Sequence, residues 1–263
     1  MTEPIRGDQE LGHQVDGDMR TDQWLRLATA EDDPAWLART RVTLTPMAAP
    51  SIMGLFGFMI ATLMVGAWQA GWYGNAATPQ ILWPLAIFAG GIFQLIAAIA
   101  CFRARDGVAL AVHTTWGAFW LGWGILQALI SLHVMAPIPL GAASQSFAFW
   151  FIGISAVTIS ATLASTAISP MLVLTLGTLA AGAALTAAGF YGGSLGVTRA
   201  GGWLFVISAA AAWLFGTAMM LEHSFGRTII PLGRYHKGAN IPGGIATRPI
   251  QRPRGMPGVR VGQ

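Results

Sequence analysis

Long runs of apolar residues, each close to the length that a helix needs to cross a bilayer, dominate the chain. A hydrocarbon core about 30 Å thick needs roughly 20 helical residues. Short connections rich in Gly, Pro and Asn, which interrupt helices, separate the runs. Because lipid offers no partner to unpaired backbone groups, the runs are expected to be helical. The pattern predicts an all-α integral membrane protein with six transmembrane helices, at Ser51–Tyr73, Gln80–Cys101, Val108–Val134, Ser146–Thr166, Pro170–Tyr191 and Gly201–Glu222.

Charged residues are almost absent from this apolar region. From Ser51 to Leu221 they are Arg103, Arg105, Asp106 and Arg199. Charged residues make up 10% of the whole chain, against roughly 25% in an ordinary soluble domain. A soluble globule of this size needs a solvated surface, so the region is expected to be surrounded by lipid.

The charges that remain divide the chain into three parts. Residues 1–46 hold nine acids and five arginines and form an acidic tail, whereas residues 223–263 hold seven basic residues and no acid. We predict an acidic N-terminal tail at 1–46, a six-helix transporter domain at 47–231 and a basic Gly/Pro-rich tail at 232–263. A basic tail beside a membrane is typical of a topology anchor and does not indicate nucleic-acid binding.

The basic residues near the helix ends predict the topology, because cytoplasmic loops carry an excess of Lys and Arg. Arg199 stands alone on one side of the predicted bundle. The other side carries Arg39, Arg41, Arg103, Arg105, Arg227, Arg234 and Lys237. We therefore expect a multi-pass protein of the plasma (inner) membrane with both termini in the cytoplasm.

The membrane region offers little for an enzyme or a cofactor. His113 and His133 lie near opposite ends of the third predicted helix, about 30 Å apart along its axis, and cannot share a metal. The sequence shows no metal-ligating cysteine pair, carboxylate pair or phosphate-binding loop. We expect no enzymatic activity, no metal and no cofactor.

Uncharged polar residues are the remaining candidates for a site. An amide such as Gln94 has four hydrogen-bonding positions and must find partners inside the bundle. It either holds helices together or lines a solute pathway, and its chemistry alone does not decide between the two. His113, Trp116, Gly117 and Trp120 share one helix face, a pattern more typical of packing than of a site. A weakly polar, uncharged interior favours a channel or porter for a small solute over an ion pump.

Three segments resemble the acetate uptake transporter family, also called the succinate–acetate permeases. Residues 88–120, FAGGIFQLIAAIACFRARDGVALAVHTTWGAFW, resemble the family's run from a Gly-Gly-Ile-x-Gln helix into a Thr-Ser-Tyr-Gly-Ser-Phe-Trp helix. Residues 225–233, FGRTIIPLG, are similar to the ending of the family. Ala49-Pro50 with Phe56-Gly57 resembles a degraded form of its signature. The resemblance spans about 47–233.

The resemblance implies a six-helix protomer, commonly a homo-hexamer, with one pore in each subunit for acetate or a similar short carboxylate, with proton coupling or channel behaviour. It implies a constriction at Phe56, Trp116 and Leu179, where Trp116 stands in place of a Tyr. It also implies polar pore residues, which would be Gln94, Thr114 and Thr115.

Departures from the family pattern leave alternatives open. Met47 and Ala48 replace the signature asparagine and proline, and Trp116 is bulkier than the usual Tyr. One alternative is therefore a transporter of a different small solute. Another is a non-transporting membrane scaffold or sensor, which the long tails suggest.

Overall fold

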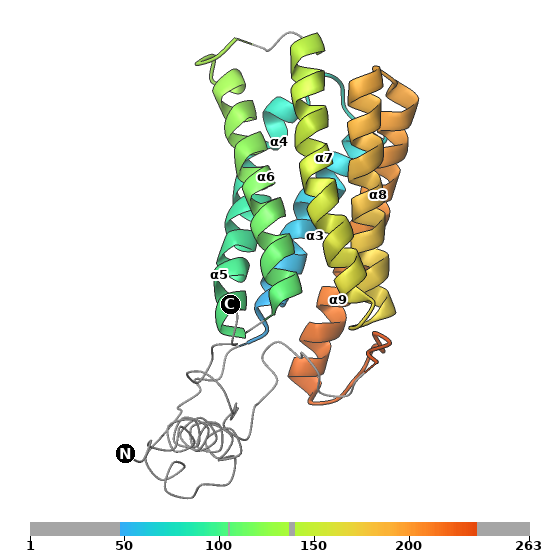
Figure 1. Ribbon diagram of the computed structural model, residues 1–263. Coiled ribbons are helices and arrows are strands. Elements are labelled where there is room, and N and C mark those ends of the chain that lie inside the picture. The colour runs from blue at the N-terminus through green and yellow to red at the C-terminus, as the bar shows by residue number, and fades with distance from the viewer. Residues whose placement is uncertain (1–47, 105, 137–139, 236–263) are drawn as a thin grey trace, which may run out of the picture. The chain divides into compact units, whose positions relative to one another are not determined.

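The computed structural model describes residues 48–104, 106–136 and 140–235 (Figure 1). These residues belong to one compact unit, Met47–Gly244. The acidic tail at 1–46 and most of the basic tail at 232–263 lie outside the described residues, so the predicted domain boundaries stay predictions. Within the described ranges the chain is helical and contains no β-strand.

Six long helical segments form the bundle, as the apolar runs predict. Five of them are long and apolar enough to cross a membrane. The exception is the third, α6, whose apolar run is diluted by polar residues such as His113, Thr114 and Gln127. The elements are α3 (Pro50–Gln69), α4 (Pro79–Leu85), the π-helix η2 (Ala86–Phe93), α5 (Gln94–Ala104), α6 (Gly107–Ser131), α7 (Leu140–Ser165), α8 (Pro170–Gly192) and α9 (Leu195–Phe225).

The helix ends follow ordinary capping chemistry. Three helices begin at a proline, which has no N–H to leave unpaired in a first turn. Ser169 caps α8 through the Leu172 amide, and Ser194 caps α9 through the Val197 amide. The sixth helix therefore begins at Leu195 and not at Gly201, and Arg199 lies within α9 instead of in a loop.

The second membrane segment is irregular in its middle. Pro84 lies inside α4 and removes one backbone donor, and the chain continues as a π-helix until Phe93. π-helical turns are rare and are frequent at functional sites. Gln94 is the first residue after this irregular stretch.

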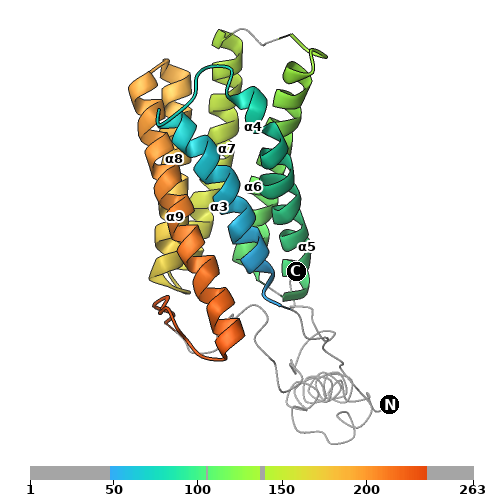
Figure 2. The same cartoon turned by 180° about the vertical axis from the view of Figure 1, so that it is seen from behind.

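α3 runs obliquely through the bundle (Figure 2). It packs against α9 on one side and against η2 and α5 on the other, while α7, α8 and α9 pack in succession. Small residues permit the closest approaches: a Cβ at Gly202 of α9 would lie 2.5 Å from the backbone nitrogen of Ala70. Such contacts are typical of membrane helices, where close packing replaces the hydrophobic effect.

The outer surface of the bundle is apolar. Large hydrophobic side chains such as Ile81, Ile99, Phe102 and Leu163 are exposed by more than half of their area. Exposed apolar surface of this extent is unfavourable in water and is typical of a lipid-facing or subunit-facing wall. The chain is a multi-pass membrane protein.

Candidate functional site

An aromatic cluster fills the centre of the bundle around Trp116, which is 1% exposed. Its ring lies 6.1 Å from that of Phe58 on α3, 5.4 Å from that of Phe119 on α6 and 6.0 Å from that of Phe205 on α9, all at steep interplanar angles. Edge-to-face packing of this kind is favourable beyond the area that it buries. The aromatic cluster therefore joins three helices at the level of Trp116.

A hydrogen bond fixes the polar edge of Trp116. Nε1 donates to Oγ1 of Thr158 on α7 at 3.1 Å, and that hydroxyl in turn donates to the Ile154 carbonyl at 2.6 Å. Buried indole N–H groups need such a partner, because an unpaired donor is costly in an apolar interior.

The three residues of the predicted constriction do not share one environment. Trp116 and Leu179 are both fully buried in the hydrophobic core. Phe56 is half-buried and lies against Gly216 of α9, where an added Cβ would be 3.2 Å from the Phe56 ring. The α3 ring beside Trp116 belongs to Phe58, two residues later and so on nearly the opposite face of the helix. A gate at Phe56 stays a prediction.

The predicted polar residues also separate. Gln94 is 0% exposed, whereas Thr114 is exposed and Thr115 is half-buried. Nε2 of Gln94 donates to the Gly90 carbonyl at 2.7 Å, and its Oε1 lies 3.3 Å from Nδ1 of His113. The structure therefore places Gln94 beside His113 in the interior and leaves Thr114 facing outward.

The hydrogen bonds of Gln94 assign the tautomer of His113. The Gly90 carbonyl can only accept, so the amide nitrogen of Gln94 faces it and the amide oxygen faces His113. That oxygen can only accept, so Nδ1 of the imidazole carries the hydrogen. In the neutral ring Nε2 then has a free lone pair, and it lies beside Gly54 of α3, where an added Cβ would be only 2.5 Å away.

A cavity of about 60 Å³ leads from one end of the bundle to His113. Asp106, Ser169 and Arg234 line it at the helix ends, and Leu176 and Phe215 line it deeper in the membrane region. His113 lies about 10 Å beyond Asp106 along α6. One turn further along α6, Trp116 is buried and does not line this cavity.

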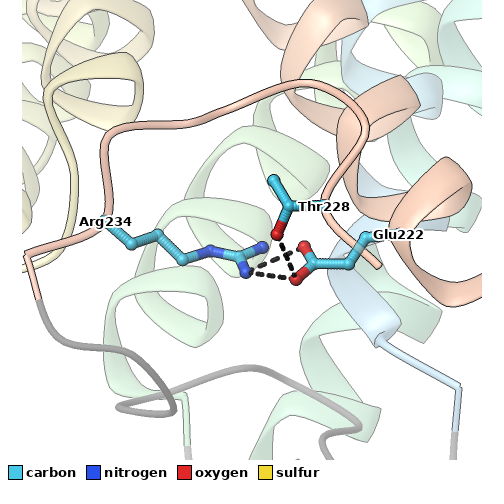
Figure 3. Close-up of polar contacts among 3 residues, drawn as sticks. All are labelled: Glu222, Thr228 and Arg234. Atoms are coloured by element: carbon cyan, nitrogen blue, oxygen red, sulfur yellow. Dashed lines mark hydrogen bonds and ion pairs between the residues drawn. The ribbon is translucent and has the colours of Figure 1, made fainter. Parts of the chain in front are cut away.

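Charged and polar groups from the chain after α9 organise the mouth (Figure 3). Arg234 forms an ion pair with Glu222 at 2.8 Å, and the Thr228 hydroxyl donates to the same carboxylate at 3.4 Å. The Tyr235 amide donates to the Ile168 carbonyl at 3.2 Å, and Leu232 is buried. We name residues 226–235 the strap, because they run from the end of α9 to the α7–α8 connection.

Asp106 contributes a second charged group at the mouth. Its Oδ1 accepts from the Ala109 amide at 2.9 Å and so caps α6. Burial raises the pKa of this carboxyl above its usual value, and hydrogen bonds from the Ala109 and Val108 amides oppose the rise.

Sequence reasoning missed part of this arrangement. It had no signal for Phe58 and Phe205, because an interior ring on an apolar helix looks like any other core residue. His113 carried a signal, since it shares a helical face with Trp116 and Trp120. Among the described residues no three metal-ligating side chains lie close enough together to hold a metal.

Comparison with known proteins adds to this geometry. A family model described as the GPR1/FUN34/yaaH family matches residues 37–232. The chain belongs to this family. It is 27% identical over 197 residues to the succinate-acetate/proton symporter SatP of Escherichia coli, covering 73% of this chain and 98% of that protein. This confirms the family resemblance of the three segments.

Two further similarities are informative. The chain is 32% identical over 177 residues to ammonia transport outward protein 2 of Saccharomyces cerevisiae, covering 63% of this chain and 59% of that protein. The solved structure of the bacterial acetate channel SatP aligns with a TM-score of 0.64 at 24% identity, covering 71% of this chain and 99% of that chain. The six-helix fold is therefore the fold of that channel.

Proposed function

We propose that the chain moves acetate or a related short-chain monocarboxylic acid across the plasma membrane, as a proton-coupled transporter or a channel. One observation carries the proposal: a cavity enters an otherwise apolar bundle and ends at the buried His113, which is paired with Gln94. The membership of the family and the name of the E. coli relative agree with this substrate class.

Dehydration of the solute is the main cost of entering the bundle. A carboxylate that enters an apolar passage loses water, which is costly unless hydrogen-bonding groups replace it. The cavity offers such groups at both ends, with Arg234 at the mouth and His113 at the inner end. Because Arg234 is paired with Glu222, it can attract an anion without holding it as a lone buried cation would.

Transport also requires a passage beyond His113. Trp116 and Leu179 fill the bundle there, so we propose that these two residues form the closed gate, with Phe56 contributing from α3. Opening would require the Trp116 ring to leave its place between Phe58 and Phe205. Thr114 and Thr115 would then act outside the gate or at a subunit contact.

We infer further that the cavity opens toward the cytoplasm, because its mouth lies beside Arg103, Asp106 and Arg234, on the side that the positive-inside rule assigns to the cytoplasm. Both tails would lie on that side. A homo-hexamer with one pore in each protomer, and a protein without enzymatic activity, complete the proposal. Both follow from the family resemblance.

Uptake of radiolabelled acetate into proteoliposomes tests the function. Uptake above that of empty vesicles, stimulated by an inward proton gradient, is the expected result. Acetate uptake equal to that of empty vesicles at every gradient would refute it.

The rival functions have their own tests. The yeast relative named for ammonia transport favours a different small solute, and competition between acetate and ammonium or methylamine separates the two. A scaffold that acts through its tails would show no uptake. Deletion of residues 1–46 and 236–263 together should leave acetate uptake intact if the chain is a transporter.

A further inference from the structure

Two buried polar groups that line the cavity have unused hydrogen-bonding capacity. Ser51 is 5% exposed and lines the cavity; among the described residues its hydroxyl has no nitrogen or oxygen partner, and its polar neighbour is the Cys101 thiol, a weak hydrogen-bonding group. His113 is 4% exposed, lines the same cavity, and its Nε2 is left free by the bond from Nδ1 to Gln94. Buried polar groups are normally paired, so unpaired ones that face a cavity indicate a ligand.

The two groups come from adjacent helices. Ser51 and Gly54 lie one turn apart on the same face of α3, and the absence of a side chain at Gly54 lets the imidazole of His113 pack directly against that turn. Ser51 and the imidazole of His113 therefore line the same cavity about one helical turn apart along α3.

The N-terminus of α3 adds a favourable electrostatic field. Ala49 occupies the N-cap position and provides no side-chain acceptor for the first-turn amides. The dipole of α3 favours negative charge near Ser51. The helix end alone would not define a site, but here it lies beside the unpaired Ser51 hydroxyl.

We propose that Ser51 and His113 bind the carboxyl group of the transported acid together with one proton; this proposal rests on the proposed function. The Ser51 hydroxyl donates to one carboxyl oxygen. The proton lies between the other oxygen and Nε2 of His113, either as the O–H of the neutral acid or as the N–H of the imidazolium beside the carboxylate. Both descriptions have the same atoms and the same net charge.

This arrangement selects against other small solutes. Neutral ammonia could donate to Nε2 and accept from the Ser51 hydroxyl through its lone pair, but it has no negative charge to interact with the positive end of α3. An ammonium ion would meet the positive end of α3. A carboxylate uses both groups and also the positive end of α3, so this combination favours a carboxyl group over ammonia or ammonium.

Other titratable or charged groups lie around the cavity. They are Asp106 and Arg234 at the mouth, Glu222 paired with Arg234, and Cys101 buried behind Ser51 near Asp106. About 10 Å separates Asp106 from His113 along α6. A variant of His113 therefore tests the coupled proton without changing these groups.

The test measures acetate binding to the full-length protein in detergent by isothermal titration calorimetry, in buffers of different ionisation enthalpy. At neutral pH wild-type protein should take up about one proton per acetate bound. His113→Asn keeps a nitrogen donor for Gln94 but removes Nε2; it should raise the dissociation constant about tenfold or more and abolish proton uptake. His113→Gln, which restores a polar atom near Nε2 but cannot take a proton, should recover part of the affinity and none of the proton uptake.

A matched pair of variants on α3 tests Ser51. Thr62 also has a buried hydroxyl with no partner among the residues that the structure describes, yet it does not line the cavity. Ser51→Ala should raise the dissociation constant several-fold, about 5-fold or more, whereas Thr62→Val should leave it within about 2-fold. Elution as a single species on size exclusion and an unchanged melting temperature establish that each variant folds.

Each outcome has one meaning. Wild-type affinity and proton uptake in His113→Asn, or equal effects of Ser51→Ala and Thr62→Val, would overturn the proposed site. Absence of acetate binding to the wild-type protein would overturn it as well. Binding with proton uptake but no acetate transport in proteoliposomes would support the site and refute the proposed function instead.

Discussion

The indole N–H of Trp116 on α6 donates to the hydroxyl of Thr158 on α7 at 3.1 Å, in a region where both residues are almost fully buried. This bond connects α6, which carries Trp116 and Phe119 of the aromatic cluster, with α7, which packs against both α6 and α8. An opening movement of the Trp116 ring must therefore break this hydrogen bond or move Thr158 together with the ring. If Trp116 forms the closed gate as proposed, Thr158 holds it in place, although its sequence context gives no sign of it.

Loss of the Thr158 hydroxyl should destabilise the bundle. Thr158→Val leaves the indole N–H of Trp116 buried and unpaired, which costs about 1–3 kcal/mol. We expect a lower melting temperature, measured by thermal unfolding in detergent with intrinsic fluorescence. Thr162→Val is the control, because that hydroxyl bonds only to its own helix, at the Thr158 carbonyl. Equal melting temperatures for the two variants would contradict the account.

Shortening Trp116 should widen the range of transported acids. Trp116→Ala removes the largest ring of the proposed gate, so butyrate uptake should rise relative to acetate uptake in proteoliposomes by about 10-fold or more. Trp213→Ala provides the control, since Trp213 is more than half exposed on the outside of α9. An unchanged butyrate-to-acetate ratio in Trp116→Ala would remove this residue from the gate.

The close contact between α3 and α9 predicts a sensitive glycine. Gly202→Ala would place a methyl group 2.5 Å from the Ala70 nitrogen, and backbone cannot move aside as a flexible side chain can. We expect a loss of about 1–3 kcal/mol in unfolding free energy. Gly153→Ala on α7 has no neighbour within 4 Å of the new Cβ and should be neutral or slightly stabilising. Thermal unfolding that ranks the two variants in the opposite order would contradict this packing.

Asp106 should affect stability in two separable ways. Asp106→Ala removes the cap of α6 and should cost about 1 kcal/mol, whereas Asp106→Asn keeps an oxygen that accepts from Ala109.

Because burial raises the pKa of Asp106, the folded state binds its proton more tightly than the unfolded state. The resulting stability is fully present below the unfolded pKa, about 4, and is lost as pH rises through the folded pKa.

Asp106→Asn is uncharged at every pH and avoids that loss. Melting curves should therefore show Asp106→Asn equal to or above wild type at neutral pH, with the difference shrinking as the pH falls toward about 4. If Asp106→Asn instead melts below wild type at neutral pH by as much as Asp106→Ala does, the carboxylate charge stabilises the mouth and the pKa of Asp106 is not raised by burial.

The bundle could be predicted from the sequence because the length of an apolar run is almost sufficient to identify a membrane-spanning helix. The prolines predicted the helix starts at Pro170 and near Pro79. The amide of Gln94 was predicted to need hydrogen-bond partners inside the bundle, and it has them. The start of α9 was missed by six residues, because Gly196 and Arg199 look like loop residues until Ser194 is seen to cap the helix.

The site was less predictable for a physical reason. Which face of an evenly apolar helix points inward depends on its neighbours, so Phe56 and Phe58 could not be told apart and Thr114 could not be seen to face outward. The partnership of His113 with Gln94 joins residues 19 apart across a helix pair and an irregular π-turn. No local pattern encodes that contact.

The central claim is that a carboxylic acid reaches His113 through the cavity and crosses the bundle with a proton. Radiolabelled acetate uptake by wild-type and His113→Asn protein in the same proteoliposomes, with and without an inward proton gradient, tests it most directly. The account predicts gradient-stimulated uptake for wild type and a KM for acetate at least about 10-fold higher in His113→Asn. Wild-type uptake no faster than that of empty vesicles, or the same KM and gradient response in both proteins, would contradict it.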